Sequence, residues 1–365
     1  MRTIPCMDLS RQFMRHKEEF LKVIRLVCEQ TAFSGGPFVA EFERQFAGRT
    51  RTQMASGVNN GTSALHLALL ALGIKPGDEV LVPANTFIAT AWAVAYVGAI
   101  PVFVDCTEDT WNMNPSSAQK AITQKTKAIM GVHLYGQPFD VDAIKTIAAD
   151  NGLFLIEDCA QAYGASFKGQ TIGGLGDIGC FSFYPSKNLG AFGEAGAVVS
   201  QNKEYIQHIQ MLKNHGAHKP YYHEEIGYNM RMDGIHAAIL SVKLKYIDAW
   251  TKRRQVIAGR YLSEIRNPNI VMPTIHKDAE SVFHLFVVMA ENKDKFLHYM
   301  EENSIICGQH YPVPCHIQKA FANLGYKTGD MPNAENLAEH CVSIPMFPEL
   351  TDDEVTYVIE TINKY

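Results

Sequence analysis

The chain has 365 residues, of which 47% are hydrophobic and 19% are charged, and its formal net charge is −5. A chain of this length and apolar content can bury one large core and a smaller one. The small net charge and the lack of a basic run argue against a nucleic-acid partner, because the phosphate backbone is bound mainly through clustered lysine and arginine. No signal-peptide pattern and no apolar stretch of about 18 residues occurs, so we expect a cytoplasmic protein without membrane contact.

The first part of the chain predicts two packing helices, one of them over residues 10–30, and then a turn that can bind an anion. Residues 54–72 indicate a strand, a loop of small residues and a helix that begins near Gly61 and Thr62. The free N–H groups of the first turn and the helix dipole can hold a phosphate, which glycine allows to approach closely. The alternative is that Thr62 or Ser63 only caps the helix.

Strands and helices then alternate regularly. Residues 79–83 and 100–105 read as strands with a helix between them at 86–97, and the pattern continues to a strand at 153–157. This alternation predicts an α/β fold with a mostly parallel sheet flanked by helices. Asp158 follows the last of these strands, at the edge of the sheet where ligands collect.

Residues 179–188 begin with an alternating apolar run that ends at a proline. One lysine, Lys187, follows two residues after that proline. The glycine-rich residues 189–197 follow, which places the amine in a tight loop. A lysine that forms a Schiff base with an aldehyde and a carboxylate that faces a pyridinium nitrogen are the minimum that pyridoxal phosphate chemistry requires. Lys187 and Asp158 can fill these roles. The alternatives are a protonated surface lysine and a structural carboxylate.

The rest of the chain mixes helices and strands less regularly. Two helices over 231–266 lead from a large domain, residues 1–245, into a smaller domain, residues 246–365, whose best strand is predicted at 281–289. The polar loop 214–223 is rich in histidine, lysine and tyrosine. Such a loop suits a nucleotide diphosphate and a sugar, although it can also be only a solvated connection.

The eight cysteines are scattered, with no CxxC pair and no His/Cys cluster of zinc-finger spacing. They indicate reduced thiols, and no metal site is predicted.

Ordered motifs run through nearly the whole chain. They are NGTSALHLAL from Asn60, HLYGQP from His133, EDCAQAYGA from Glu157, SFYPSKNLG from Ser182, GYNMRMD from Gly227, HYP from His310 and MFPELT from Met346. In this order they resemble the DegT/DnrJ/EryC1/StrS family of sugar aminotransferases, which are pyridoxal-phosphate enzymes of fold type I. The resemblance implies a large domain with a mostly parallel sheet and a smaller α+β C-terminal domain.

The resemblance also implies roles for single residues. Lys187 would carry the cofactor pyridoxal 5′-phosphate and act as general base and acid, while Asp158 would keep the ring nitrogen protonated. Phe87 would stack on the pyridine ring, although a lone aromatic is more often part of the core. Gln161 would reach the ring hydroxyl, the alternative being a solvent-facing side chain.

For the cofactor phosphate, the resemblance implies contacts from Gly61, Thr62 and Ser182. Asn229 matches the family asparagine that reaches the phosphate from the neighbouring subunit. A homodimer with shared sites is therefore expected.

The resemblance implies L-glutamate as the amino donor and a nucleotide-linked keto-sugar as the acceptor, in deoxyamino-sugar and glycan biosynthesis. Arg231-Met232-Asp233 favours members that aminate carbon 3 of the sugar over those that aminate carbon 4. The residues expected on the sugar-nucleotide side are Tyr184, His215, Lys219, Tyr221, Tyr222 and His310.

Two rival functions use the same fold. One is a pyridoxal-dependent dehydratase or lyase. The dehydratase branch replaces the lysine by histidine, which the intact Lys187 argues against. The other is a non-enzymatic regulator, which the loss of Lys187 or Asp158 would have indicated.

Overall fold

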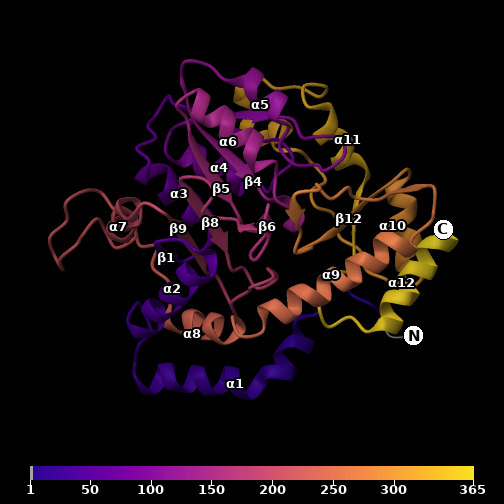
Figure 1. The fold of residues 1–365 in the computed structure, drawn as a ribbon, viewed down its shortest axis with the longest axis horizontal. Helices are drawn as coiled ribbons and strands as arrows, with labels where there is room; N and C mark the ends of the chain where they lie inside the picture. Colours follow the sequence, from indigo (N-terminus) through magenta and orange to yellow (C-terminus); the bar gives the residue numbers. More distant parts are fainter. Residues whose placement is uncertain (1–2) are drawn as a thin grey trace.

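A computed structural model describes residues 3–365 of the chain. Its central element is a seven-stranded sheet in the order β1-β9-β8-β5-β4-β2-β3 (Figure 1). The strands are β1 (Met54–Val58), β2 (Glu79–Pro83), β3 (Ile100–Val104), β4 (Thr126–Val132), β5 (Phe154–Asp158), β8 (Ile178–Ser182) and β9 (Gly196–Ser200). Strands β8, β5, β4, β2 and β3 run parallel, and β9 runs antiparallel to both its neighbours. The predicted α/β fold with a mostly parallel sheet is therefore confirmed.

Alternate residues of each strand point to opposite sides of the sheet, and apolar side chains point to both sides. Helices therefore pack on both faces. In β2, Val80 and Val82 pack into one apolar cluster and Leu81 into another. The helices of the first face are α3 (Gly61–Ala71), α4 (Ala89–Tyr96) and α7 (Lys203–Leu212). Those of the second face are α2 (Pro37–Thr50), α5 (Pro115–Ala121), α6 (Val141–Asp150) and α8 (Gly234–Lys243). Helix α1 (Leu9–Glu29) packs outside α8.

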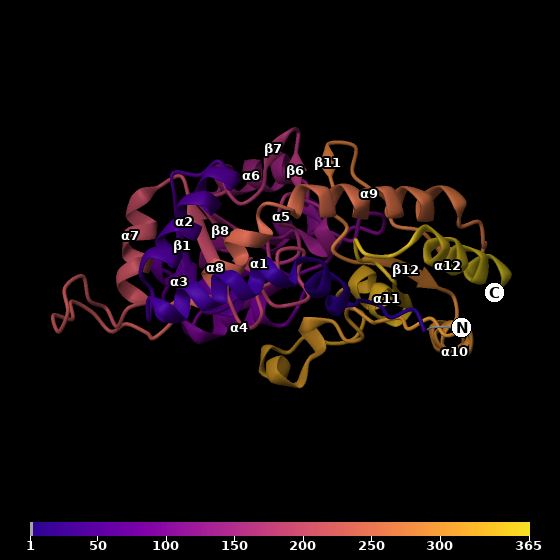
Figure 2. The same cartoon turned by 90° about the horizontal axis from the view of Figure 1, so that it is seen from below.

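A smaller α+β part follows, reached through the long helix α9 (Ile247–Glu264), as Figure 2 shows. It contains the antiparallel sheet β10-β12-β13. Its elements are β10 (Ile270–Val271), β12 (Phe286–Ala290), β13 (Cys341–Ile344), α10 (Lys293–Glu302), α11 (Pro332–His340) and α12 (Asp352–Lys364). A third, small sheet joins β11 (Ala279–Glu280) to β6 (Ser166–Phe167) and β7 (Gln170–Thr171).

The division of the chain between residues 245 and 246 stays a prediction, and two segments cross it. Ile4 packs in the apolar cluster of the C-terminal part, whereas Phe321 packs in a cluster of the large sheet. The two parts therefore share chain from both sides of the predicted boundary.

The strand predicted at 281–289 is shorter than expected, since β12 covers only Phe286–Ala290. The preceding residues instead bind segments that follow strands of the large sheet. The Val282 N–H donates to the carbonyl of Gly136 at 3.0 Å, and the Asn188 side chain donates to the Val282 carbonyl at 3.1 Å. These bonds anchor the segment beside the loop that carries Lys187.

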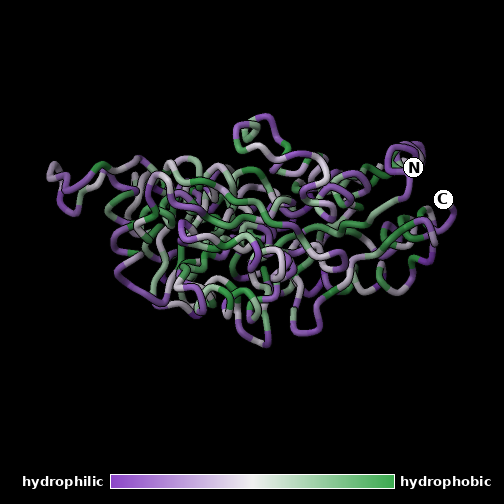
Figure 3. Tube along the Cα trace, turned by 90° about the horizontal axis from the view of Figure 1, so that it is seen from above, coloured by the Kyte–Doolittle hydropathy of each residue, from purple (hydrophilic) through white to green (hydrophobic). Residues whose placement is uncertain are grey.

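The tube in Figure 3 shows apolar chain in the interior. The segment that joins α7 to α8 projects from the body and is mostly hydrophilic. None of the helices in the described part of the chain combines the length and the apolar character that a bilayer span requires.

Candidate active site

A cavity of about 680 Å³ opens at the carboxyl ends of the parallel strands, where β5 ends at Asp158 and β8 ends at Ser182. The first turn of α3 forms one side of it. Of the predicted site residues, the wall contains Gly61, Thr62, Phe87, Asp158, Gln161, Ser182, Tyr184, Lys187 and His310. Residues that are far apart in the sequence therefore meet at one edge of the sheet.

Asp158 is 5% exposed, and its carboxylate is held in one orientation. Its Oδ2 accepts from Thr90 Oγ1 at 2.9 Å and its Oδ1 from the Ala160 N–H at 3.1 Å. Burial raises the pKa of Asp158, while the Lys187 charge acts in the opposite direction. Among residues 3–365 no cationic side chain lies within ion-pair distance of this carboxylate. A protonated ring nitrogen in the cavity would supply the missing partner.

Lys187 lies in the turn that follows β8. The turn is closed by the Lys187 N–H, which donates to the carbonyl of Tyr184 at 2.8 Å, and by the tight approach of Gly190. A Cβ at Gly190 would lie 2.2 Å from the carbonyl oxygen of Pro185, so only glycine fits there. Burial lowers the pKa of Lys187 to about 8, although the carboxylate of Asp158 acts to raise it. The amine is therefore closer to its nucleophilic form than an ordinary lysine is at neutral pH.

The first turn of α3 has the features of an anion site. Asn60 caps the helix, since its Oδ1 accepts from the Ser63 N–H at 2.8 Å; the alternative of a cap by Thr62 or Ser63 is wrong. The N–H groups of Gly61 and Thr62 have no partner within the helix and stay free for a ligand. A Cβ at Gly61 would lie 2.6 Å from Cβ of Ser182, so glycine is what brings the helix against the end of β8. These residues fit a bound phosphate.

Gln161 is 5% exposed, so the alternative of a solvent-facing side chain is wrong. Its Oε1 accepts from the Tyr135 N–H at 2.8 Å, and its Nε2 donates to the Tyr311 hydroxyl at 2.9 Å. The Tyr311 ring lies 5.6 Å from the ring of Phe87, centroid to centroid. Phe87 is 50% exposed, so it belongs to the cavity wall and not to the core.

The cavity wall also contains polar residues for which the sequence predicted no role, among them Thr90, Glu194, His284 and Tyr311. His284 is buried and its Nδ1 lies 3.1 Å from Oδ1 of Asn188. Burial lowers the pKa of His284, and burial together with the Lys187 charge lowers the pKa of His310 to about 4. Both imidazoles are therefore neutral near neutral pH.

A buried pair lies directly behind Asp158. Glu157 accepts from the N–H groups of Gly173, Leu175 and Gly176, each at 2.8 Å. Nε2 of His133 lies 3.0 Å from Oε2 of Glu157, and the His133 N–H donates to the carbonyl of Asp158 at 3.0 Å. The pair fixes the end of β5 and with it the position of Asp158.

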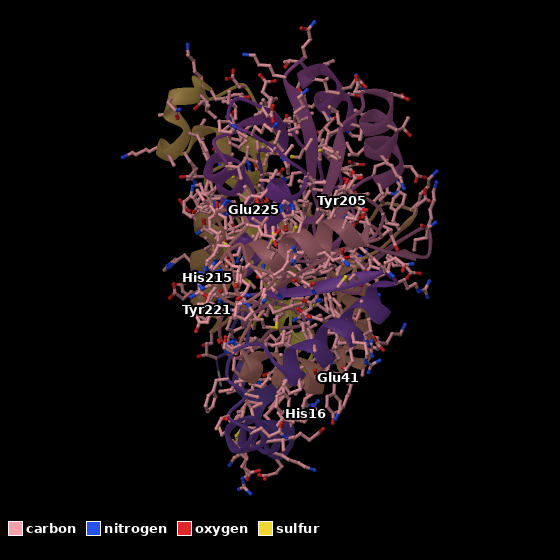
Figure 4. The ribbon with its side chains drawn as sticks, turned by 90° about the vertical axis from the view of Figure 1, so that its left-hand side faces the viewer. His16, Glu41, Tyr205, His215, Tyr221 and Glu225 are labelled. Atoms are coloured by element: carbon pink, nitrogen blue, oxygen red, sulfur yellow. The ribbon has the colours of Figure 1, made fainter. Side chains whose placement is uncertain are left out.

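The loop 214–223, expected on the sugar-nucleotide side of the site, does not line the cavity of its own chain. His215, Lys219, Tyr221 and Tyr222 are exposed and line no part of the cavity. The segment projects from the body after α7 in Figures 1 and 2, and Figure 4 shows His215 and Tyr221 on it. It folds on itself, because the N–H of Tyr222 donates to the carbonyl of Lys219 at 3.0 Å.

The predicted phosphate contact Asn229 lies at the base of the same segment, which we call the arm (residues 214–229). Asn229 is exposed and pairs with Asn214 in an isolated antiparallel bridge. It does not reach the cavity of its own chain.

Comparison with known proteins gives one consistent picture. The chain matches the model of the DegT/DnrJ/EryC1/StrS aminotransferase family over residues 14–363. It is 41% identical over 365 residues to the Pleiotropic regulatory protein of Geobacillus stearothermophilus, covering 99% of this chain and 98% of that protein. It is 40% identical over 363 residues to a dTDP-3-amino-3,4,6-trideoxy-α-D-glucose transaminase of Streptomyces venezuelae, covering 99% and 96%.

The crystal structure of S. venezuelae DesV in complex with a ketimine intermediate has the same fold, with a TM-score of 0.98 and 39% sequence identity. The match covers 100% of this chain and 98% of that one.

Proposed function

Because this chain belongs to the DegT/DnrJ/EryC1/StrS aminotransferase family and uses pyridoxal 5′-phosphate, we propose that it transfers an amino group from L-glutamate to a keto-sugar linked to a nucleoside diphosphate. The observation that carries the proposal is the meeting of Lys187 and Asp158 in one cavity beside the free N–H groups of α3. The carbon proposed for amination is carbon 3, which is supported by Arg231-Met232-Asp233 and by the name of the S. venezuelae transaminase.

The bound cofactor supplies an electron sink for the carbon that carries the amine. Lys187 would hold the cofactor through its amine and, once that amine is free, could take up a proton and return it. Asp158, oriented by Thr90, keeps the proton on the ring nitrogen. Ser182 and the first turn of α3 would hold the phosphate of the cofactor close to Lys187.

The substrate assignment can be tested with a panel of dTDP-, UDP- and GDP-linked sugars, each offered as the 3-keto and the 4-keto isomer with L-glutamate as donor. We expect one 3-keto sugar to be aminated with a kcat/KM at least about tenfold above that of its 4-keto isomer. Preference for a 4-keto sugar would move the amination to carbon 4. Release of water or ammonia without an amino-sugar product would favour the dehydratase or lyase alternative.

We further propose a homodimer in which the arm of one subunit reaches the cavity of the other. The arm exposes large side chains that a monomer would normally cover, with Tyr221 94% and Ile226 89% exposed. Asn229 at its base would then meet the cofactor phosphate of the partner, and Lys219 would meet the diphosphate of the sugar nucleotide. The dimer is tested by the molar mass in solution at several protein concentrations. A monomer at all of them would contradict it.

Lys219→Ala should raise KM for the sugar nucleotide by about tenfold or more, because a charge-assisted contact to the diphosphate is lost. The glutamate half-reaction should keep its rate, since glutamate carries no diphosphate. KM for the sugar nucleotide can be measured by steady-state kinetics. The rate of the glutamate half-reaction can be measured separately by stopped-flow absorbance of the bound cofactor.

Lys203→Ala is the matched control, because Lys203 is an exposed lysine at the start of α7, outside the arm. If Lys219→Ala lowered the activity of both half-reactions equally, or of neither, the arm would be only a solvated connection without a role in binding the sugar nucleotide.

A further inference from the structure

A second cavity, of about 410 Å³, lies between the start of α1 and the loop that follows Lys187. It does not share a wall residue with the cavity of Lys187 and Asp158. Its wall consists of Leu9, Ser10, Gln12, Phe13, Pro185, Ala191, Phe192 and Lys243. Helix α1 runs alongside α8 in Figure 1, and Lys243 is the last residue of α8.

Lys243 is the unusual member of this wall. It is 2% exposed, yet its ammonium has no hydrogen bond and no ion pair among residues 3–365. The nitrogen lies 5.0 Å from the ring centroid of Phe192 and 5.8 Å from that of Phe20. Aromatic faces attract a cation, but they replace only part of the hydration that burial removes.

The carboxylate of Glu349 is near Lys243, but the two side chains are not in contact. Glu349 acts on Lys243 at longer range, and its own Oε1 is buried without a hydrogen-bond partner. Burial lowers the pKa of Lys243 to about 8 and raises the pKa of Glu349. The Lys243 nitrogen therefore has no carboxylate of the described chain in contact with it, although its residue forms part of the wall of an open cavity.

We propose that this cavity binds a small amphipathic organic anion, whose carboxylate meets the Lys243 ammonium and whose hydrocarbon part packs on Leu9, Phe13 and Phe192. The charge of the ligand follows from the unpaired buried cation. Its apolar part follows from the side chains that form the rest of the wall. The site is separate from that of the proposed sugar substrate, so the inference does not depend on the identity of that substrate.

The test is isothermal titration calorimetry of the holoenzyme with octanoate, and with octan-1-ol as a neutral probe of the same length. Wild-type protein should bind octanoate at least about tenfold more tightly than octanol, because only octanoate forms a charge-assisted contact. Lys243→Met keeps the apolar stem and removes the charge. It should weaken octanoate binding by about tenfold or more and leave octanol binding unchanged.

Lys245→Met is the matched control, because Lys245 lies two residues further along the chain and is exposed. Leu9→Trp fills the cavity from its rim and should reduce the binding of both probes. This variant keeps the proposal testable if Lys243→Met does not fold. No octanoate binding to wild-type protein, equal affinity for the two probes, or octanoate binding that persists in Lys243→Met would overturn the proposal.

Discussion

Lys187→Ala should lower the rate of amino-group transfer by about 10⁴-fold or more, because the variant loses the amine that we propose holds the cofactor and moves the proton. Lys187 is the only lysine in the described wall of the cavity, so no second amine can take its place. The fold should persist. The Lys187 ammonium makes no hydrogen bond in the described structure, and its removal leaves no buried partner unsatisfied. We expect the free energy of unfolding to change by less than about 1 kcal/mol.

The measurement combines single-turnover kinetics with denaturant unfolding of the same preparation. Lys187→Arg is the informative second variant, because it keeps the positive charge but cannot form the covalent link to the cofactor. It should be as inactive as Lys187→Ala. If either variant transferred amino groups at the wild-type rate, the role of Lys187 would be wrong; activity in Lys187→Arg alone would reduce that role to one of charge.

Asp158→Asn should still bind the cofactor but lose about 10²–10³-fold in kcat, because a neutral amide cannot hold the proton on the ring nitrogen. The substitution nearly preserves the size of the side chain, so contacts with the phosphate and the ring should remain. Cofactor affinity is measured by equilibrium dialysis and kcat with saturating substrates.

Thr90→Val provides the graded comparison. It removes the hydrogen bond of 2.9 Å to Oδ2 of Asp158 but leaves the charge in place. Its loss of kcat should therefore be about tenfold or smaller. Kinetics of Asp158→Asn equal to wild type, or a larger loss in Thr90→Val than in Asp158→Asn, would contradict the role given to Asp158.

The residues that the sequence predicted correctly for the cavity are those whose positions follow from local chain geometry. Asp158 is the last residue of a buried strand, and Gly61 begins the helix that follows another strand of the same sheet. Each therefore lies at the carboxyl edge of the sheet. Lys187 follows from the turn that Gly190 makes possible.

The residues that escaped prediction depend on contacts between distant segments. Thr90 reaches Asp158 across 68 positions of sequence and Tyr311 reaches Gln161 across 150. Thr90 carried a weak signal, since it lies one helical turn after Thr86, with which it shares a hydrogen bond of 2.9 Å. His284 carried no such signal, because the sequence of its segment predicts a strand. In the structure this segment lies outside the sheet, and Val282 bonds to Gly136 instead.

The arm shows the limit of composition as a guide. Its histidine, lysine and tyrosine side chains suit a nucleotide, but composition does not say which cavity they face. The turn between Lys219 and Tyr222 and the bridge between Asn214 and Asn229 close the arm on itself, away from the body of its own chain. In the proposed dimer its destination depends on a second chain, which one sequence does not describe.

We expect the amine of Lys187 to carry the cofactor, and this can be tested directly. Reduction of the holoenzyme with sodium borohydride, followed by proteolysis and mass spectrometry, identifies the residue that holds it. We expect the pyridoxyl group on Lys187 in the wild-type protein and its absence from Lys187→Ala. A pyridoxyl group on another lysine, with Lys187 unmodified, would contradict the assignment.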